Sequence, residues 1–179
     1  MQVMGISGLP GSGKSLVSDI ATEKGAIIVI MGDIIREEAK KRGESTKETA
    51  QNLRAEHGEY IVSELTIKKI KKLQEEGNEN TIIVEGIRSP HEVNMFKENF
   101  ENFIILSIFA NPALRFKRLQ KRMREDDSKD YYEFLKRDQM ELVFGIGTVI
   151  ALSYKIITNE SDLESYTEKI NEFLKEVNL

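Results

Sequence analysis

Eight residues near the N-terminus constrain the fold of this chain more than any other segment. Residues 8–15 read Gly-Leu-Pro-Gly-Ser-Gly-Lys-Ser, a full match to the pattern G-x-x-x-x-G-K-[ST]. The apolar residues 2–7 precede them like a buried strand, and residues 16–21 continue them as a helix with one apolar face. A strand, a glycine-rich turn and a helix in this order form a phosphate-binding loop, so the sequence predicts a nucleotide-binding domain.

Each residue type in this loop has a chemical reason to be there. Glycines allow positive φ angles, which turn successive backbone N–H groups inward onto a polyphosphate. Lys14 would reach the β- and γ-phosphates, and the Ser15 hydroxyl would bind Mg²⁺. We therefore expect ATP and Mg²⁺ as ligands. The ATP-binding residues would be Gly8, Leu9, Pro10, Gly11, Ser12, Gly13, Lys14, Ser15 and Leu16.

The composition excludes several other classes of protein. The chain has 179 residues, no cysteine and a net charge of −4, which excludes disulfides and thiolate zinc sites and argues against broad nucleic-acid binding. The longest apolar runs, 26–31 and 103–110, are too short to span a membrane, and the sequence has no recognisable signal peptide. We expect a single cytoplasmic domain over residues 1–179.

Apolar runs of strand length alternate with helical patterns along the whole chain. Such alternation predicts a three-layer α/β fold of the P-loop type, with a parallel sheet covered by helices on both faces. The five predicted strands are residues 2–7, 26–31, 81–85, 103–109 and 154–158.

Two long helical stretches interrupt this alternation. The first is an insertion over residues 33–77, on the side where a phosphoryl acceptor would bind, and it contains a long helical stretch over 45–77. The second is a predicted lid over residues 111–149. Helical insertions of this kind close over the ligands of phosphoryl-transfer enzymes, and we expect both to reach over the nucleotide site.

Charged residues follow the second and third predicted strands, where the ligand crevice of a parallel sheet opens. The sequence Gly-Asp-Ile-Ile-Arg follows the second strand and Glu-Gly-Ile-Arg follows the third. Glu85 is a candidate for ordering the waters of Mg²⁺, while Arg36 and Arg88 could clamp a phosphate. A structural role fits the first of these patterns equally well, with Asp33 as a helix cap and Arg36 on a solvated helix face.

Positive charge is concentrated in the predicted lid. Residues 115–137 contain nine Lys or Arg and five Asp or Glu, a local charge of +4. Arg118 and Arg122 share one helix face, while Arg124 and Arg137 are further candidates for contacts with the phosphates. The alternative is a solvated amphipathic helix with ion pairs at i, i+4 spacing.

These motifs together resemble the nucleoside monophosphate kinases, adenylate kinase in particular. Across its whole length the chain is most similar to little-characterised archaeal proteins described as related to adenylate kinase and dephospho-coenzyme A kinase. The resemblance implies that Arg36 and Arg88 hold the acceptor phosphate, with Asp33 and Gly86 in the same site, and that lid arginines close on the transferring group. The implied catalytic residues are Lys14, Asp33, Arg118 and Arg122.

The chain departs from adenylate kinases at two positions of these motifs. Glu85 replaces the usual Asp, and Ile87 stands where a proline is expected. Three functions therefore stay open. The first is phosphorylation of a nucleoside monophosphate, with AMP as the expected acceptor. The second is phosphorylation of an alcohol as in dephospho-coenzyme A kinase, with Asp33 as the general base. The third is an assembly factor that binds ATP and AMP, hydrolyses ATP slowly and engages a protein or RNA partner.

Overall fold

The computed structural model describes residues 2–122 and 130–179 of the chain. Over these residues it contains one sheet of five parallel strands in the spatial order β2-β3-β1-β4-β5. The strands are β1 (Val3–Ser7), β2 (Ile27–Ile30), β3 (Ile82–Glu85), β4 (Ile104–Phe109) and β5 (Lys155–Thr158). Their bounds lie within one residue of the predicted ones, so the predicted five-stranded parallel α/β fold is confirmed.

Helices connect the strands, as expected for a parallel sheet. They are α1 (Lys14–Glu23), α2 (Met31–Arg42), α3 (Thr46–His57), α4 (Ile61–Glu75), α5 (Pro90–Asn99), α6 (Pro112–Arg122), α7 (Tyr131–Phe144), α8 (Ile146–Ala151) and α9 (Leu163–Glu176). Over the described residues, no helix is both long and apolar enough to cross a membrane.

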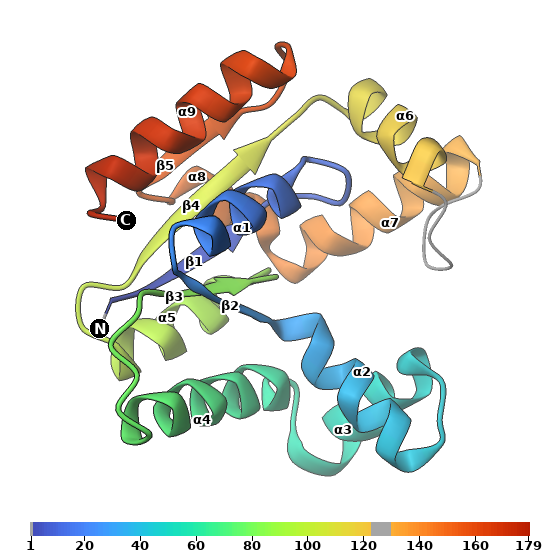
Figure 1. Cartoon of the computed structure of the whole chain (residues 1–179). Helices are drawn as coiled ribbons and strands as arrows, with labels where there is room; N and C mark the ends of the chain where they lie inside the picture. The colour runs from blue at the N-terminus through green and yellow to red at the C-terminus, as the bar shows by residue number, and fades with distance from the viewer. Residues whose placement is uncertain (1, 123–129) are drawn as a thin grey trace.

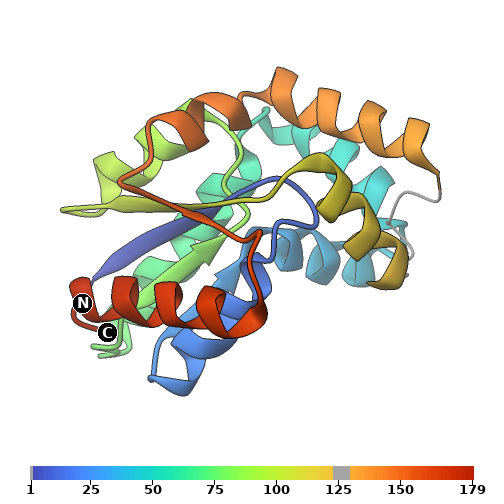
Figure 2. The ribbon, with the colours of Figure 1, turned by 90° about the horizontal axis from the view of Figure 1, so that it is seen from above.

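The sheet is the middle of three layers, as Figure 2 shows from above. Alternate side chains of each strand point to opposite faces, which is why β1 contributes to two separate cores. Val3 belongs to the core that α4, α5 and α8 close, whereas Met4 and Ile6 belong to the core that α1 and α9 close. The sheet is therefore packed against helices on both of its faces.

Local sequence signals explain where several helices begin. Ser89 and Glu92 form a capping box at the start of α5, where Pro90 occupies the first helical position. The side chain of Asp130 caps α7 and that of Asp162 caps α9. These caps satisfy backbone N–H groups that would otherwise lack partners, so they fix the residues at which the three helices begin.

The two predicted insertions each divide into a part on the sheet and a part beyond it. In the first insertion, Ile67 and Ile70 of α4 are buried in the core, while α2 and α3 extend beyond the end of β2 (Figure 1). In the second, Ile146 and Val149 of α8 are buried, whereas α6 and α7 extend past the sheet. In Figure 1 both projecting pairs, α2–α3 and α6–α7, lie toward the end of the sheet from which the loop that precedes α1 emerges.

Candidate functional site

The loop between β1 and α1 has the backbone geometry that its sequence predicts. Its glycines Gly8, Gly11 and Gly13 have φ angles of 144°, 80° and 101°, values that other residues rarely adopt. The N–H of Ser12 closes the turn by donating to the carbonyl of Leu9 at 3.1 Å. The helix α1 begins directly after this turn, so its unpaired N–H groups face the concave side where an anion would bind.

All three glycines are also required by close packing, and a Cβ atom on Gly8 would overlap the backbone oxygen of Ile108. A Cβ atom on Gly11 would lie 2.7 Å from the backbone oxygen of Arg115, and one on Gly13 would overlap the side-chain amide of Asn159. The loop is thus held against α6 and against the segment after β5. The loop has no room for a larger residue at any of the three glycines.

Three side chains from distant parts of the sequence donate hydrogen bonds to carbonyls of the loop. The amide Nδ2 of Asn159 donates to Ser12 O at 2.8 Å, and the hydroxyl of Tyr166 donates to Gly13 O at 3.0 Å. Arg115 donates from Nη1 to Pro10 O at 3.2 Å. With their carbonyls fixed in this way, the loop N–H groups keep their orientation before any ligand binds.

Arg115 also connects the loop to both helices of the predicted lid. Its side chain is 2% exposed, forms an ion pair with Asp138 of α7 and lies over the ring of Phe134 at 5.0 Å. Its Nε donates to Ala110 O at 3.0 Å. A charge this deeply buried is tolerated because its donors are paired, so Arg115 fixes α6, α7 and the loop relative to one another.

Lys14 lies inside the loop rather than extending into solvent. Its Nζ donates to Gly8 O at 2.7 Å and to Leu9 O at 3.4 Å. Burial lowers the pKa of Lys14 to about 8; the carboxylates of Glu85 and Glu141 oppose this shift, and the charge of Arg88 adds to it. A bound polyphosphate would replace the two carbonyls as partner of the amine and favour its charged form.

The residues predicted to hold Mg²⁺ supply the oxygen ligands that this ion prefers. Ser15 is exposed at the start of α1, and Glu85 ends β3 beside the central strand. The Glu85 carboxylate accepts a hydrogen bond from Ser18 Oγ at 2.7 Å, which fixes its direction. Over the described residues, no cluster of three acidic or histidine side chains could hold a metal alone. The arrangement fits an ion that is held mainly by phosphate and water.

One cavity of about 300 Å³ brings most of the predicted site residues together. Its lining does not include the predicted residues Leu9, Ser12, Leu16 and Asp33. The phosphate-binding loop forms its floor, and its walls come from α2, from the segment after β3 and from α6 and α7. Arg124 lies outside the described residues, so its predicted role stays a prediction. The predicted residues that line the cavity are Gly8, Pro10, Gly11, Gly13, Lys14, Ser15, Arg36, Glu85, Gly86, Arg88, Arg118, Arg122 and Arg137.

Arg118 is the lid arginine with the most defined position. Its Nη2 donates to the backbone oxygen of Asn159 at 2.9 Å and to Asn159 Oδ1 at 3.1 Å. Its Nη1 is buried without a hydrogen-bond partner. A buried donor that lacks a partner is costly, so this atom is suited to an anionic ligand in the cavity.

The two arginines predicted to bind the acceptor are each paired with a carboxylate. Arg36 donates to Asp33 one turn earlier in α2, and Arg88 donates from Nη1 to Glu141 Oε1 at 3.2 Å. Asp33 does not cap the helix as its sequence suggested. Because α2 begins directly at the end of β2 with Ile30 as its N-cap, Asp33 lies inside the first turn.

Sequence reasoning missed the residues that hold the site in place. Asn159 carried a usable signal, because it is a polar residue directly after a parallel strand, the rule that identified Glu85. Arg115, Tyr166 and Glu141 carried none, since their helical positions look like ordinary core or surface positions.

Comparison with known families places the chain among P-loop proteins. The sequence profile of the AAA domain family matches residues 7–135. The UPF0200 protein of Methanothermobacter thermautotrophicus is 45% identical over 177 residues, which cover 99% of this chain and 91% of the relative. The UPF0200 protein of Pyrococcus furiosus is 42% identical over 176 residues, which cover 94% of each chain.

Solved structures share the fold at much lower sequence identity. Shikimate kinase from Bacteroides thetaiotaomicron has a TM-score of 0.64 at 14% identity and covers 99% of both chains. Shikimate kinase from Acinetobacter baumannii in complex with shikimate has a TM-score of 0.62 at 12% identity, with 99% of this chain and 93% of that chain covered. The chain therefore has a P-loop fold of the kind found in small-molecule kinases.

Proposed function

We propose that this chain, which belongs to the UPF0200 family and contains a P-loop domain that matches the AAA domain family, transfers the γ-phosphoryl group of Mg-ATP to a nucleoside monophosphate. AMP is the first acceptor to test. One observation carries the proposal: a single cavity is lined by the phosphate-binding loop and by Arg36 and Arg88 from two other elements. Cations on separate walls would hold the phosphates of donor and acceptor next to each other.

The proposed reaction assigns a separate task to each wall of the cavity. The loop N–H groups and Lys14 bind the β- and γ-phosphates of the donor, while Ser15 and Glu85 hold Mg²⁺ and its waters. Bound Mg²⁺ neutralises charge on the phosphates. Arg118, whose Nη1 is buried without a partner, would donate from this atom to the donor phosphates and stabilise the charge of the transferring group.

A monophosphate acceptor needs no general base. Its phosphate is already a dianion near neutral pH because its second pKa is about 6, so positioning and charge neutralisation suffice. The two arginines on separate walls of the cavity support this choice, because Arg36 would exchange Asp33 for the acceptor phosphate. Arg88, on the other wall, would bind the same acceptor phosphate.

Phosphorylation of an alcohol is the second candidate. It is favoured by the two similar solved structures, which are named as kinases of shikimate rather than of a nucleotide. In this reaction Asp33 would leave Arg36 and accept the proton of the acceptor hydroxyl.

A coupled assay with Mg-ATP tests both candidates on the same protein. The acceptors are the nucleoside monophosphates, dephospho-coenzyme A and shikimate. The proposal expects turnover with AMP at about 1 to 100 per second, the ordinary range for kinases. Turnover with an alcohol alone would establish the second candidate. Slow ATP hydrolysis without phosphorylation of any acceptor would contradict both and favour a nucleotide-dependent assembly factor.

A further inference from the structure

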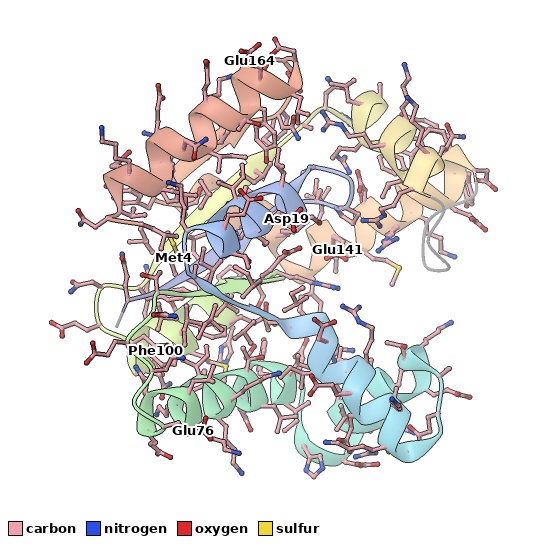
Figure 3. The ribbon with its side chains drawn as sticks, viewed as in Figure 1. Met4, Asp19, Glu76, Phe100, Glu141 and Glu164 are labelled. Carbon is pink, nitrogen blue, oxygen red and sulfur yellow. The ribbon has the colours of Figure 1, made fainter. Side chains whose placement is uncertain are left out.

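The carboxylate of Glu141 occupies an unexpected place in the cavity. Glu141 lies on α7, as labelled in Figure 3. It lines the cavity wall, pairs with Arg88 and lies close enough to Lys14 to affect its pKa. Its side chain is 13% exposed, whereas that of Arg88 is 50% exposed. The local charge of the predicted lid gave no reason to expect an acidic residue facing a site for anions.

The backbone around both partners is held firmly. Asp138, one turn before Glu141, pairs with the buried Arg115, and this pair fixes the rotation of α7. The carboxylate of Glu92 accepts the backbone N–H of Arg88 at 2.7 Å. Only the long side chain of Arg88 is half exposed, so it is the partner that can exchange one anion for another.

The geometry points to Glu141 as a residue that competes with the acceptor phosphate for Arg88 and thereby raises the affinity that an anion needs to occupy the acceptor site. A phosphate can bind Arg88 bidentately only if it displaces the Glu141 carboxylate. This requirement weakens the binding of every anion at Arg88 by a similar factor. Inorganic phosphate would then bind too weakly to fill the site, whereas a phosphomonoester that makes additional contacts would still displace the carboxylate. The inference rests on the proposed function, because it assigns the acceptor phosphate to Arg88.

The substitution Glu141→Gln tests this competition because it keeps the shape of the side chain and removes its charge. Inorganic phosphate and AMP are each titrated by calorimetry, with and without a non-hydrolysable Mg-ATP analogue. Loss of an ion pair that is partly exposed, together with loss of the repulsion on the incoming anion, should tighten binding of both ligands about tenfold. Adenosine, which lacks a phosphate, should bind the variant and the parent protein equally.

Two further variants show whether the gain arises at Arg88. In the double variant Arg88→Ala with Glu141→Gln the gain should vanish, which separates this site from phosphate binding in the loop. Glu98→Gln, which removes one exposed carboxylate from α5, should leave all affinities unchanged. A gain in affinity is a result that damage to the fold would not produce.

Unchanged or weaker binding of phosphate and AMP by Glu141→Gln would overturn the inference, and so would a gain that persists without Arg88. A failure of the proposed function looks different. In that case the parent protein would not bind the Mg-ATP analogue, while the phosphate titration of the nucleotide-free variant would still measure the competition at Arg88.

Discussion

The donor side and the acceptor side of the cavity are built in opposite ways. On the donor side, the loop carbonyls are bound by Asn159, Tyr166 and Arg115, which are all buried. On the acceptor side, the side chains of Arg36 and Arg88 are 56% and 50% exposed, and each is paired with a carboxylate. The difference indicates a donor site that is formed before ligand binding and an acceptor site whose ion pairs must rearrange.

The sharpest test of this comparison uses the two ion pairs that involve α7. Asp138→Ala leaves the buried guanidinium of Arg115 unpaired and should lower the free energy of unfolding by about 3 to 5 kcal/mol. Glu141→Ala breaks the half-exposed pair with Arg88 and should cost less than about 1 kcal/mol. Urea denaturation followed by circular dichroism measures both values. Equal losses would show that the two sides do not differ in rigidity.

The next largest effect is expected at Lys14, in catalysis and not in folding. Lys14→Ala should lower phosphoryl transfer roughly a hundredfold to a thousandfold, because one donor to the transferring charge is lost. The free energy of unfolding should stay equal or rise, since the variant buries no charged amine. Lys68→Ala, on the exposed face of α4, is the matched control. Full activity of the Lys14 variant would exclude the loop from the reaction.

Asn159 tests whether the donor side depends on support from outside the loop. Asn159→Ala removes the two side-chain hydrogen bonds, to Ser12 O and from Arg118 Nη2, and should weaken Mg-ATP binding about tenfold, as expected for two buried hydrogen bonds. Acceptor affinity should not change. Asn171→Ala on the exposed face of α9 provides the control. Calorimetry that finds equal losses for donor and acceptor would contradict a role confined to the donor side.

Arg88 provides the converse test on the acceptor side. Arg88→Ala should weaken AMP binding by about fivefold to tenfold through loss of a charge-assisted contact, with a much smaller change in Mg-ATP affinity. The comparison of KM values for the two substrates measures the difference. Similar losses for both would place Arg88 at the donor phosphates instead.

The smallest expected effect is a pH dependence that arises at Lys14. Because the pKa of this lysine is lowered to about 8, the free protein loses its proton above pH 8, while bound polyphosphate favours the charged amine. Mg-ATP binding should therefore take up a proton, and its affinity should fall between pH 8 and 9. Calorimetry in buffers of different ionisation enthalpy measures the uptake, which should be absent in Lys14→Ala. Uptake that persists in this variant would assign the titration to another group.

The lowered pKa of Lys14 also predicts how the free energy of unfolding changes with pH. The pKa of Lys14 is lower in the folded protein than in the unfolded chain, so the unfolded chain binds more protons between pH 8 and about 10.4. The contribution of Lys14 to the free energy of unfolding should therefore rise with pH across this window. Unfolding measurements on the parent protein and on Lys14→Ala isolate that contribution.

The sequence predicted the sheet and the loop because both depend on local patterns. Strand-like runs of five to seven residues predicted all five strands, and the octapeptide predicted the donor loop. The supports of the loop were missed because Arg115 and Tyr166 lie 105 and 153 residues from the carbonyls that they bind. Only the strand order brings such residues together. The cap assigned to Asp33 failed because β2 passes into α2 without a turn.

The central claim is that the loop and the acceptor arginines bind two phosphate groups in one cavity. Calorimetry with a bisubstrate analogue, two adenosines joined by five phosphates, measures this most directly. The account predicts one magnesium-dependent site per chain, with binding weakened by Lys14→Ala and by Arg88→Ala. Folded protein that binds neither this analogue nor Mg-ATP would contradict the account.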